Sequence, residues 1–387
     1  MANAAQERIN AIRRYLRGEA ASAICRAVGR TRRWFYKWLA RYEPGNSQWA
    51  QSRSRAPHRV GSKTAVAVER LVCQVRQRLI KTRYAQRGAL AIQWQLQQLG
   101  VESVPPLWTI NRILKRQGLV VKATYQPRGT PYPTRPPRRP NDVHQLDLVG
   151  PRYLQGGARF YGVHVIDTFS NAVALEVAVS KEAVVLVEAV VAAWQRLGLP
   201  RVLQVDNELA FRGSNRYPRS FGLLIRLCLY VGVELVFIPE GEPWRNGVIE
   251  RFNDVYDKLF FRSQRFRDLA HVRGEVPTFE RFHNTQHRYA KLHQRVPWRV
   301  HTSVGRRRLS RRFRLHQRGL PWREGRVSFI RLTDAQGAIR FFSERFAVDP
   351  TLVHEYVTGT ISTRPGLLKF THQGRLIKVY KYAVTKR

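Results

Sequence analysis

The chain has 387 residues, with 68 Lys and Arg against 27 Asp and Glu, and a formal net charge of +41. This length allows roughly two to four domains. The hydrophobic content of 43% is enough for at least one packed core, which excludes disorder throughout. So large a positive excess predicts a polyanionic partner. Nucleic acid is the usual one, because neutralised phosphates release their counterions. Membrane-surface binding and a ribosomal type of basic protein are the alternatives. The excess of Arg over Lys favours nucleic acid, because Arg makes bidentate phosphate contacts.

The three cysteines, Cys25, Cys73 and Cys228, fit no zinc-finger spacing and predict buried, reduced thiols. The first residues are polar and do not resemble a signal peptide. The most apolar run, residues 183–199, is interrupted by Glu and Arg and is too short for a membrane span. We therefore expect a cytoplasmic protein with no membrane partner.

Residues 1–45 are expected to form a helix-turn-helix unit. Gly29 supplies a turn that needs positive φ, and Thr31 is suited to cap the helix that follows. The apolar side of that helix, with Phe35 and Trp38, faces a core. Its opposite side is free to contact DNA and carries Arg32, Arg33, Tyr36 and Lys37.

A polar linker over 46–60 precedes a second expected helix-turn-helix unit over 61–120. Two prolines, Pro105 and Pro106, separate its last two helices. The DNA contacts expected from its final helix are Trp108, Asn111 and Arg112. An ordinary helical hairpin is the alternative for either unit, but two such units in a chain of charge +41 favour DNA binding.

Residues 121–141 are a Pro-rich basic linker, too rich in Pro for a helix or a central strand. From 142 to 265, three strand-like runs are followed by alternating helix and strand patterns. These patterns predict an α/β core with a mixed sheet and flanking helices. Residues 266–320 are basic and partly helical. Residues 321–387 contain five short strands, which suggests a small β-barrel.

Three acids stand out in a chain that is poor in acids. Asp147 lies within a strand, Asp206 ends a strand, and Glu250 lies one turn into a helix that Asn246 can cap. Phosphodiester transfer needs charge neutralised on the attacking and leaving oxygens, and two Mg²⁺ or Mn²⁺ ions roughly 3.5–4 Å apart provide it. These ions prefer oxygen ligands. A salt bridge to Arg is the alternative for each acid taken alone.

The segments HQLDLVG, QVDNELAF and PEGEPWRNGVIERFN resemble the catalytic core of integrase-type DDE transposases of bacterial insertion sequences, within the retroviral-integrase superfamily. The NG-x-x-ERF box is the most specific element. The resemblance implies an RNase H-like fold in which Asp147, Asp206 and Glu250 bind two Mg²⁺ or Mn²⁺ ions. Family spacing counted strictly from Asp206 lands on Glu242. We prefer Glu250, because the box and a helix carry it.

The resemblance also implies a function: binding of transposon ends, 3′-end nicking and strand transfer into target DNA by a homodimer or higher oligomer. Whether an accessory ATPase takes part is left open. Trp244 is expected either to stack on an unpaired base or to pack its loop. Arg245, Asn246 and Lys258 are expected near DNA. A catalytically silent DNA-binding regulator and an RNase H-like nuclease without joining activity are the alternatives.

The remaining acids and histidines are expected to have structural or surface roles. Asp167 is expected to cap the hairpin between the second and third strands of the core. His144 and His164 lie in strands and are expected to be core residues. The histidines of the basic helical stretch are expected to be solvated or to contact phosphate: His283, His287 and His293.

Overall fold

The computed structural model divides into two compact units, residues 1–64 and 65–387. It describes residues 2–52, 64–120, 132–133, 135–213, 219–315, 320–342 and 344–385. Large parts of the two expected linkers, 46–60 and 121–141, lie outside these described residues. Within the described ranges, no helix is both long and apolar enough to cross a membrane.

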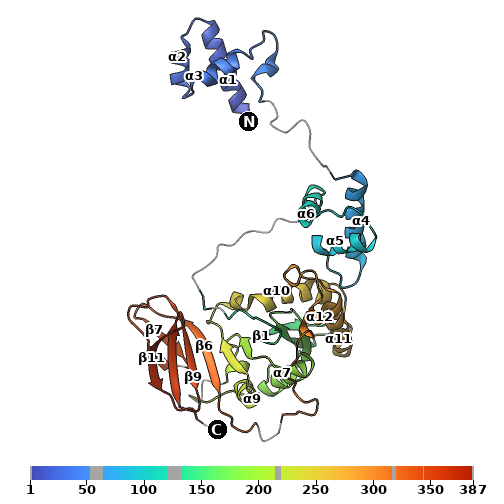
Figure 1. Cartoon of the computed structure of the whole chain (residues 1–387), viewed down its shortest axis with the longest axis vertical. Helices are drawn as coiled ribbons and strands as arrows, with labels where there is room; N and C mark the ends of the chain where they lie inside the picture. The colour runs from blue at the N-terminus through green and yellow to red at the C-terminus, as the bar shows by residue number, and fades with distance from the viewer. Residues whose placement is uncertain are drawn as a thin grey trace. The chain divides into compact units, whose positions relative to one another are not determined.

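The first unit is a bundle of three helices and confirms the expected N-terminal helical unit (Figure 1). The helices are α1 (Ala2–Leu16), α2 (Ala21–Ala27) and α3 (Arg32–Leu39), followed by a 3-10 turn (Ser47–Ala50). The Thr31 hydroxyl accepts a hydrogen bond from the Trp34 amide (3.2 Å), so Thr31 caps α3 as expected. Gly29 has φ +62°, the conformation expected of this turn. Ile24 and Phe35 are fully buried between the helices.

The second unit begins with another group of three helices. They are α4 (Val66–Lys81), α5 (Ala89–Gln98) and α6 (Leu107–Arg116). Pro106 directly precedes α6, where its fixed φ and missing N–H are tolerated. Apolar residues at helical spacing, such as Val72, Ile92 and Ile110, form a small core of their own.

The core is a mixed sheet, as expected. Its strands are β1 (Val143–Tyr153), β2 (Arg159–Asp167), β3 (Val173–Ala178), β4 (Val202–Val205) and β5 (Glu234–Phe237). The first three are antiparallel neighbours, and β4 pairs in parallel with both β1 and β5. In this register Asp147 lies opposite His164, and Gln145 lies beside Gln204.

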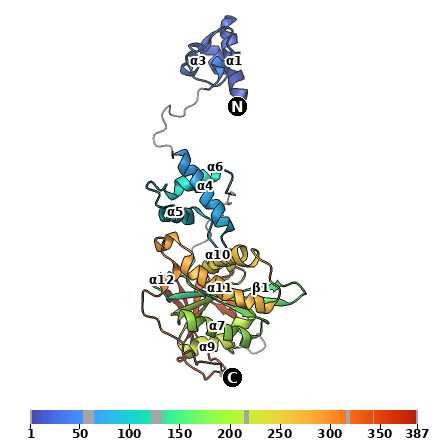
Figure 2. The same ribbon diagram turned by 90° about the vertical axis from the view of Figure 1, so that its right-hand side faces the viewer.

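Helices cover both faces of the sheet (Figures 1 and 2). One face, with Leu146, Val165 and Leu203, is buried under α7 (Ala183–Leu197), α8 (Leu209–Arg212) and α9 (Leu223–Val231). The other face is covered by α10 (Gly247–Tyr256), a π-helical turn (Asp257–Phe261) and α11 (Leu269–Gln286). Three short helices complete the core: Pro243–Asn246, Ala290–Leu292 and α12 (Pro297–His301).

The C-terminal region is rich in strands, as expected, but it continues the core sheet. Its strands are β6 (Arg326–Leu332), β7 (Ala338–Phe341), β8 (Glu344–Ala347), β9 (Tyr356–Ser362), β10 (Leu367–His372) and β11 (Arg375–Lys381). Because β6 pairs in parallel with β5, the strands form a sheet of order β11-β10-β9-β6-β5-β4-β1-β2-β3. The β7–β8 hairpin packs Phe341 and Phe346 on the same apolar cluster. We expected a small barrel here, and the structure instead pairs these strands with the core sheet through β5 and β6.

A buried ion pair joins Asp167, at the end of β2, to His301 in α12. His301 also bonds the end of α7. His301 donates through Nδ1 to the Asp167 carboxylate (2.8 Å) and through Nε2 to the Leu197 carbonyl (2.8 Å). Both side chains are fully buried. Asp167 also accepts from the Phe169 amide (3.0 Å), which confirms its role as a cap of the β2–β3 hairpin. Burial would raise the pKa of the Asp167 carboxyl, but the His301 hydrogen bond and the charges of His144 and His301 hold the pKa below its usual value.

This pair predicts a pH-dependent stability. The lowered Asp167 pKa contributes stability above the unfolded pKa of about 3.9, and this stability is lost as the pH falls through the folded pKa. Asp167→Asn should lower the free energy of unfolding at pH 7 by about 3–5 kcal/mol, because His301 loses its buried partner. Urea unfolding of the full chain measures this. The difference from wild type should shrink below about pH 4. The exposed Asp254→Asn is the matched control, and equal effects of both variants would contradict the account.

Candidate active site

The N-terminus of α10 is seated on two glutamines from neighbouring strands. The Gln145 side-chain oxygen accepts from the amides of Val248 (3.2 Å) and Ile249 (2.9 Å). Gln204 donates to the Asn246 side chain (3.0 Å). A free helix N-terminus leaves amides without partners, so these bonds fix where the helix begins.

Asn246 therefore has a different role from the one expected. Its side chain makes no capping bond to α10, is 3% exposed, and lies 3.4 Å from the Leu146 carbonyl. Gln145 caps the helix from β1 in its place. Asn246 is buried between the sheet and the helix, so it is not available to DNA, which corrects the prediction for this residue.

Asp147 extends from β1 on the face that α10 covers. One carboxylate oxygen accepts from the Leu148 amide (2.9 Å), and the other accepts from the Asn253 side-chain amide (2.5 Å). Burial raises the pKa of Asp147, and the nearby charge of Glu250 raises it further. Asp147 and Glu250 therefore lie within electrostatic reach of one another.

Asp206 lies directly after β4, at the carboxyl end of the strand. Its carboxylate accepts from the Glu208 amide (3.2 Å). Burial raises the pKa of Asp206 to about 6, with further contributions from the charges of Asp147 and Glu208. Glu250 lies in the first turn of α10, and burial raises its pKa as well. The fold thus brings the three sequence-predicted acids to one edge of the sheet.

Carboxylates crowded in this way are suited to a divalent cation. Each acid is partly or largely buried and is held with a raised pKa, so its ionised form lacks a compensating charge. Hard oxygen donors are the ligands that Mg²⁺ and Mn²⁺ prefer. Among the described residues, no group of three or more His, Cys, Asp or Glu is close enough to hold a metal ion as it stands. The chemistry of the donors fits the ion, and the carboxylates would have to close around it.

Asn253 and His164 support Asp147, a role that we did not predict from the sequence. Asn253 is one helical turn after Glu250, and its side-chain oxygen accepts from His164 Nδ1 (2.8 Å). Burial lowers the pKa of His164 to about 4, so the imidazole is neutral at pH 7. His164 is a buried strand residue, as expected. The i, i+3 spacing from Glu250 was the available signal for Asn253.

The loop before α10 is fastened to the C-terminal strands. The Tyr356 hydroxyl in β9 lies 2.7 and 2.8 Å from the two Glu242 carboxylate oxygens. Arg245 donates to Glu242 (2.8 Å) and to the Tyr356 oxygen (2.9 Å). Glu242 is therefore an anchor of the loop, which favours Glu250 over Glu242 as the third acid. Arg245 is half-buried, is ion-paired with Glu242 and lies 4.2 Å from the ring of Tyr132, and its contact with DNA stays a prediction.

A second connection from the C-terminal strands reaches the residue after Asp206. The buried Arg331 of β6 donates to the Asn207 side-chain oxygen (2.6 Å) and to the Ile238 carbonyl (3.0 Å). The Asn207 side-chain amide also donates to the Ile238 carbonyl (2.7 Å). Burial lowers the pKa of Arg331 to about 10, which leaves it charged at neutral pH. The turn that carries Asp206 is thus held by a strand from outside the expected core.

Two predicted DNA-contacting residues near the site are exposed. Trp244 is 59% exposed on the loop before α10, so it does not pack that loop. Lys258 is exposed and pairs with Asp254 (2.6 Å). Asp257 is buried and pairs with Arg152 (2.8 Å).

The predicted DNA-reading residues of the two helical units are also exposed. On α6, Trp108 is 62% exposed, and Arg112 lies 5.7 Å from its ring. Each of the other predicted contacts is exposed on its helix: Arg32, Arg33, Tyr36 and Lys37 on α3, and Asn111 on α6. Their contact with DNA stays a prediction.

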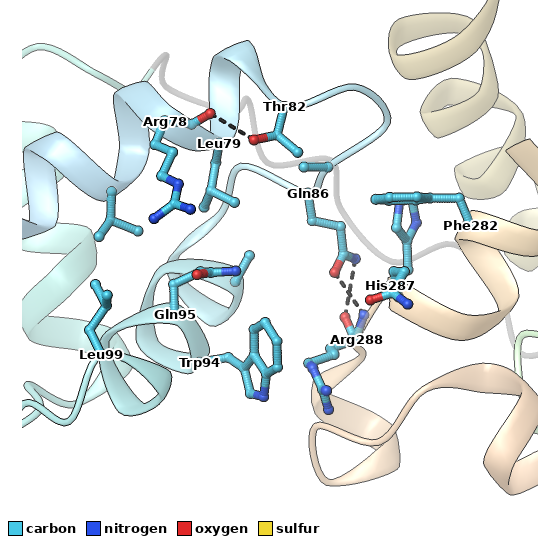
Figure 3. Close-up of a pocket in the computed structure, with 14 residues that line it drawn as sticks. Arg78, Leu79, Thr82, Gln86, Trp94, Gln95, Leu99, Phe282, His287 and Arg288 are labelled. Atoms are coloured by element: carbon cyan, nitrogen blue, oxygen red, sulfur yellow. Dashed lines mark hydrogen bonds between the residues drawn. The ribbon is translucent and has the colours of Figure 1, made fainter.

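The predictions for His283 in α11 and for His287 directly after it were wrong. His283 and His287 are buried, and His287 donates to the Tyr84 carbonyl (2.8 Å), because the chain after α4 packs against α11. Figure 3 shows the neighbouring pocket of about 290 Å³, where Gln86 exchanges two hydrogen bonds with the Arg288 main chain (2.7 and 3.1 Å). Arg288 also lies 4.2 Å from the Trp94 ring. His293 is exposed, as expected.

Sequence and structure comparisons give consistent matches. The homeodomain-like domain family matches residues 2–47, and the integrase core domain family matches residues 231–297. No curated protein matches the sequence of the chain.

Several retroviral integrase structures are similar in part. The HTLV-2 integrase catalytic core domain in complex with magnesium is 19% identical, covers 42% of this chain and 98% of its own, and has a TM-score of 0.33. A chain of the simian T-cell lymphotropic virus intasome in complex with PP2A regulatory subunit B56 gamma is 14% identical, covers 76% and 96%, and has a TM-score of 0.40. The BIV integrase catalytic core domain is 16% identical, covers 42% and 93%, and has a TM-score of 0.32.

The anchored loop gives a testable prediction. Tyr356→Phe removes the hydroxyl that bonds Glu242 and Arg245, and a hydrogen bond to a charged group contributes about 1.5–3 kcal/mol. Hydrogen exchange of the amides over 240–246 should therefore accelerate by about tenfold or more, while β9 itself stays protected. The exposed Tyr153→Phe is the matched control. Unchanged exchange of the loop in Tyr356→Phe would show that the phenol does not hold it.

Proposed function

We propose that this chain, a member of the integrase and transposase superfamily by its homeodomain-like and integrase core domains, is a DNA transposase that nicks the 3′ ends of a transposon and joins them to target DNA. The observation that carries the proposal is the placement of Asp147 and Asp206 on paired strands, next to the first turn of α10 that holds Glu250 and is bonded to β1 through Gln145 and Asn253. A salt bridge to Arg, the structural alternative for each acid, is absent from all three among the described residues.

The three carboxylates are proposed to hold two Mg²⁺ or Mn²⁺ ions. Bound there, the ions supply positive charge to the attacking and leaving oxygens of a phosphodiester. The chain's own part is to keep the donors in place. Asn253 holds one oxygen of Asp147, the Glu208 amide holds Asp206, and Gln145 fixes the helix that carries Glu250.

The DNA-binding elements are proposed from exposure and charge. We assign recognition of transposon ends to the exposed side chains of α3 and α6, and stacking on an unpaired base to Trp244. The partners are duplex DNA of the transposon ends and of the target. Cutting and joining two ends together requires a homodimer or higher oligomer on the DNA. Such an enzyme works on the nucleoid, in the bacterial cytoplasm.

The test is a cleavage and joining assay on labelled transposon-end DNA with Mg²⁺ or Mn²⁺. Asp206→Asn and Glu250→Gln should each lower both activities by about a hundredfold or more, since several kcal/mol of transition-state stabilisation is lost. Glu242→Gln is the matched control. It keeps an acceptor for Tyr356 and should retain both products.

Three other outcomes would each contradict part of the proposal. Loss of activity in Glu242→Gln, with activity kept in Glu250→Gln, would reassign the third carboxylate. Cleavage without joining of a pre-nicked end would identify a nuclease. DNA binding without any cleavage by the wild-type chain would identify a regulator.

A further inference from the structure

A strap of six arginines, residues 306–314, runs along the C-terminal part of α7. Gln195 of α7 donates to the main-chain oxygens of Ser310 (3.0 Å) and Phe313 (3.2 Å). The Leu199 amide donates to the Arg307 carbonyl (2.7 Å). These bonds use the main chain of the strap and fix its course. The guanidinium groups of Arg306, Arg307 and Arg314 donate to main-chain carbonyls, which leaves their positive charge without a carboxylate partner.

The strap, α7 and α11 enclose an open groove of about 1110 Å³. Arg281 of α11 and Arg308 and Arg311 of the strap line it, together with Trp298. Arg306 lies 5.2 Å from the Trp298 ring. The groove therefore combines several cations with an aromatic surface.

The positive charge of the groove is not balanced. Its one acidic lining residue, Glu280, is occupied by Arg196 (3.0 Å) and the Leu175 amide (2.8 Å). Across the described residues, the strap arginines and Arg281 form no ion pair with a carboxylate. Burial lowers the pKa of Arg306, and the neighbouring charge of Arg308 lowers it further. Like charges held together in this way favour a bound anion.

The groove is separate from the candidate active site. α7 ends at Leu197, and β4 begins at Val202, so the end of α7 lies near the amino end of β4. Asp206 follows the carboxyl end of the same strand. The groove and the carboxylates therefore lie toward opposite ends of β4, a strand that spans about 13 Å as four extended residues.

We propose that this groove binds the phosphodiester backbone of duplex DNA, as a second DNA-contacting surface remote from the catalytic edge. The inference rests on the proposed function in taking DNA as the polyanion. Guanidinium groups bind phosphate in a bidentate manner. A second copy of the chain offers little acidic surface for the groove, because its 27 Asp and Glu face 68 Lys and Arg.

The test measures binding of a random-sequence duplex by the full chain at several salt concentrations, without divalent cations. The triple variant Arg281→Gln, Arg308→Gln, Arg311→Gln should weaken binding and reduce the slope of log K against log salt by roughly 2–3, at about 0.9 per phosphate contact. The control removes the same charge from exposed sites elsewhere, with Arg159→Gln, Arg340→Gln and Arg375→Gln. Equal changes in the two triple variants would overturn the proposal.

A crosslink identifies the occupant directly. A photoreactive residue in place of the exposed Thr285, which also lines the groove, should form an adduct with the duplex. An adduct with a second copy of the chain, and none with DNA, would overturn the proposal. Because neither experiment requires cleavage or joining, a chain that shows the groove effect without joining DNA would contradict the proposed function and leave the groove standing.

Discussion

The arrangement of the candidate site depends on how the first turn of α10 is seated on the sheet. Gln145 and Gln204 are direct neighbours in the parallel β1–β4 pair, and together they bind the start of the helix and the Asn246 before it. Buried amides need partners, so this seat sets both the position and the rotation of the helix. Glu250 and Asn253 then face β1, where Asn253 bonds Asp147. Two neutral side chains of the sheet thus position the helix that carries Glu250 relative to Asp147 and Asp206. Burial raises the pKa of each acid, the charge of a neighbouring acid adds to this for Asp147 and Asp206, and a bound divalent cation would favour the ionised forms.

The C-terminal strands also hold the segments that flank the candidate site. The pairing of β6 with β5 places Arg331 beside the turn after β4, and β9 places Tyr356 under the loop before α10. Both segments that flank the site are therefore braced from the C-terminal side. The chain between α4 and α5 is fixed in a similar way, with Tyr84 buried in the aromatic cluster beneath α10 and α11. The second helical unit and the C-terminal strands consequently belong to one compact unit with the core.

Local patterns predicted the local features of the molecule. Thr31 and Gly29 marked the first helix-turn-helix, and three strand-like runs marked β1 to β3. Long-range pairings were not predictable in this way. A helix cap from Gln145, about a hundred residues away, leaves no signal beside the helix, and Asn246 looked like the cap because it has the right residue type. His287 looked available for DNA because it is polar, but it is buried and bonds the Tyr84 carbonyl, which is distant in sequence. The bond from Arg245 to Tyr356 is equally distant and was not predicted. The continuation of the sheet through β6 depends on tertiary pairing that strand propensity alone does not encode.

The central claim is that Asp147, Asp206 and Glu250 form one cation site. A crystal structure of the chain grown with Mn²⁺, with anomalous data collected for manganese, tests it most directly. The account predicts manganese peaks bounded by the carboxylates of these three residues, with Glu242 still bonded to Tyr356. Manganese bound at Glu240 or Glu242, or no manganese beside Asp147 and Asp206 at saturating concentration, would contradict it.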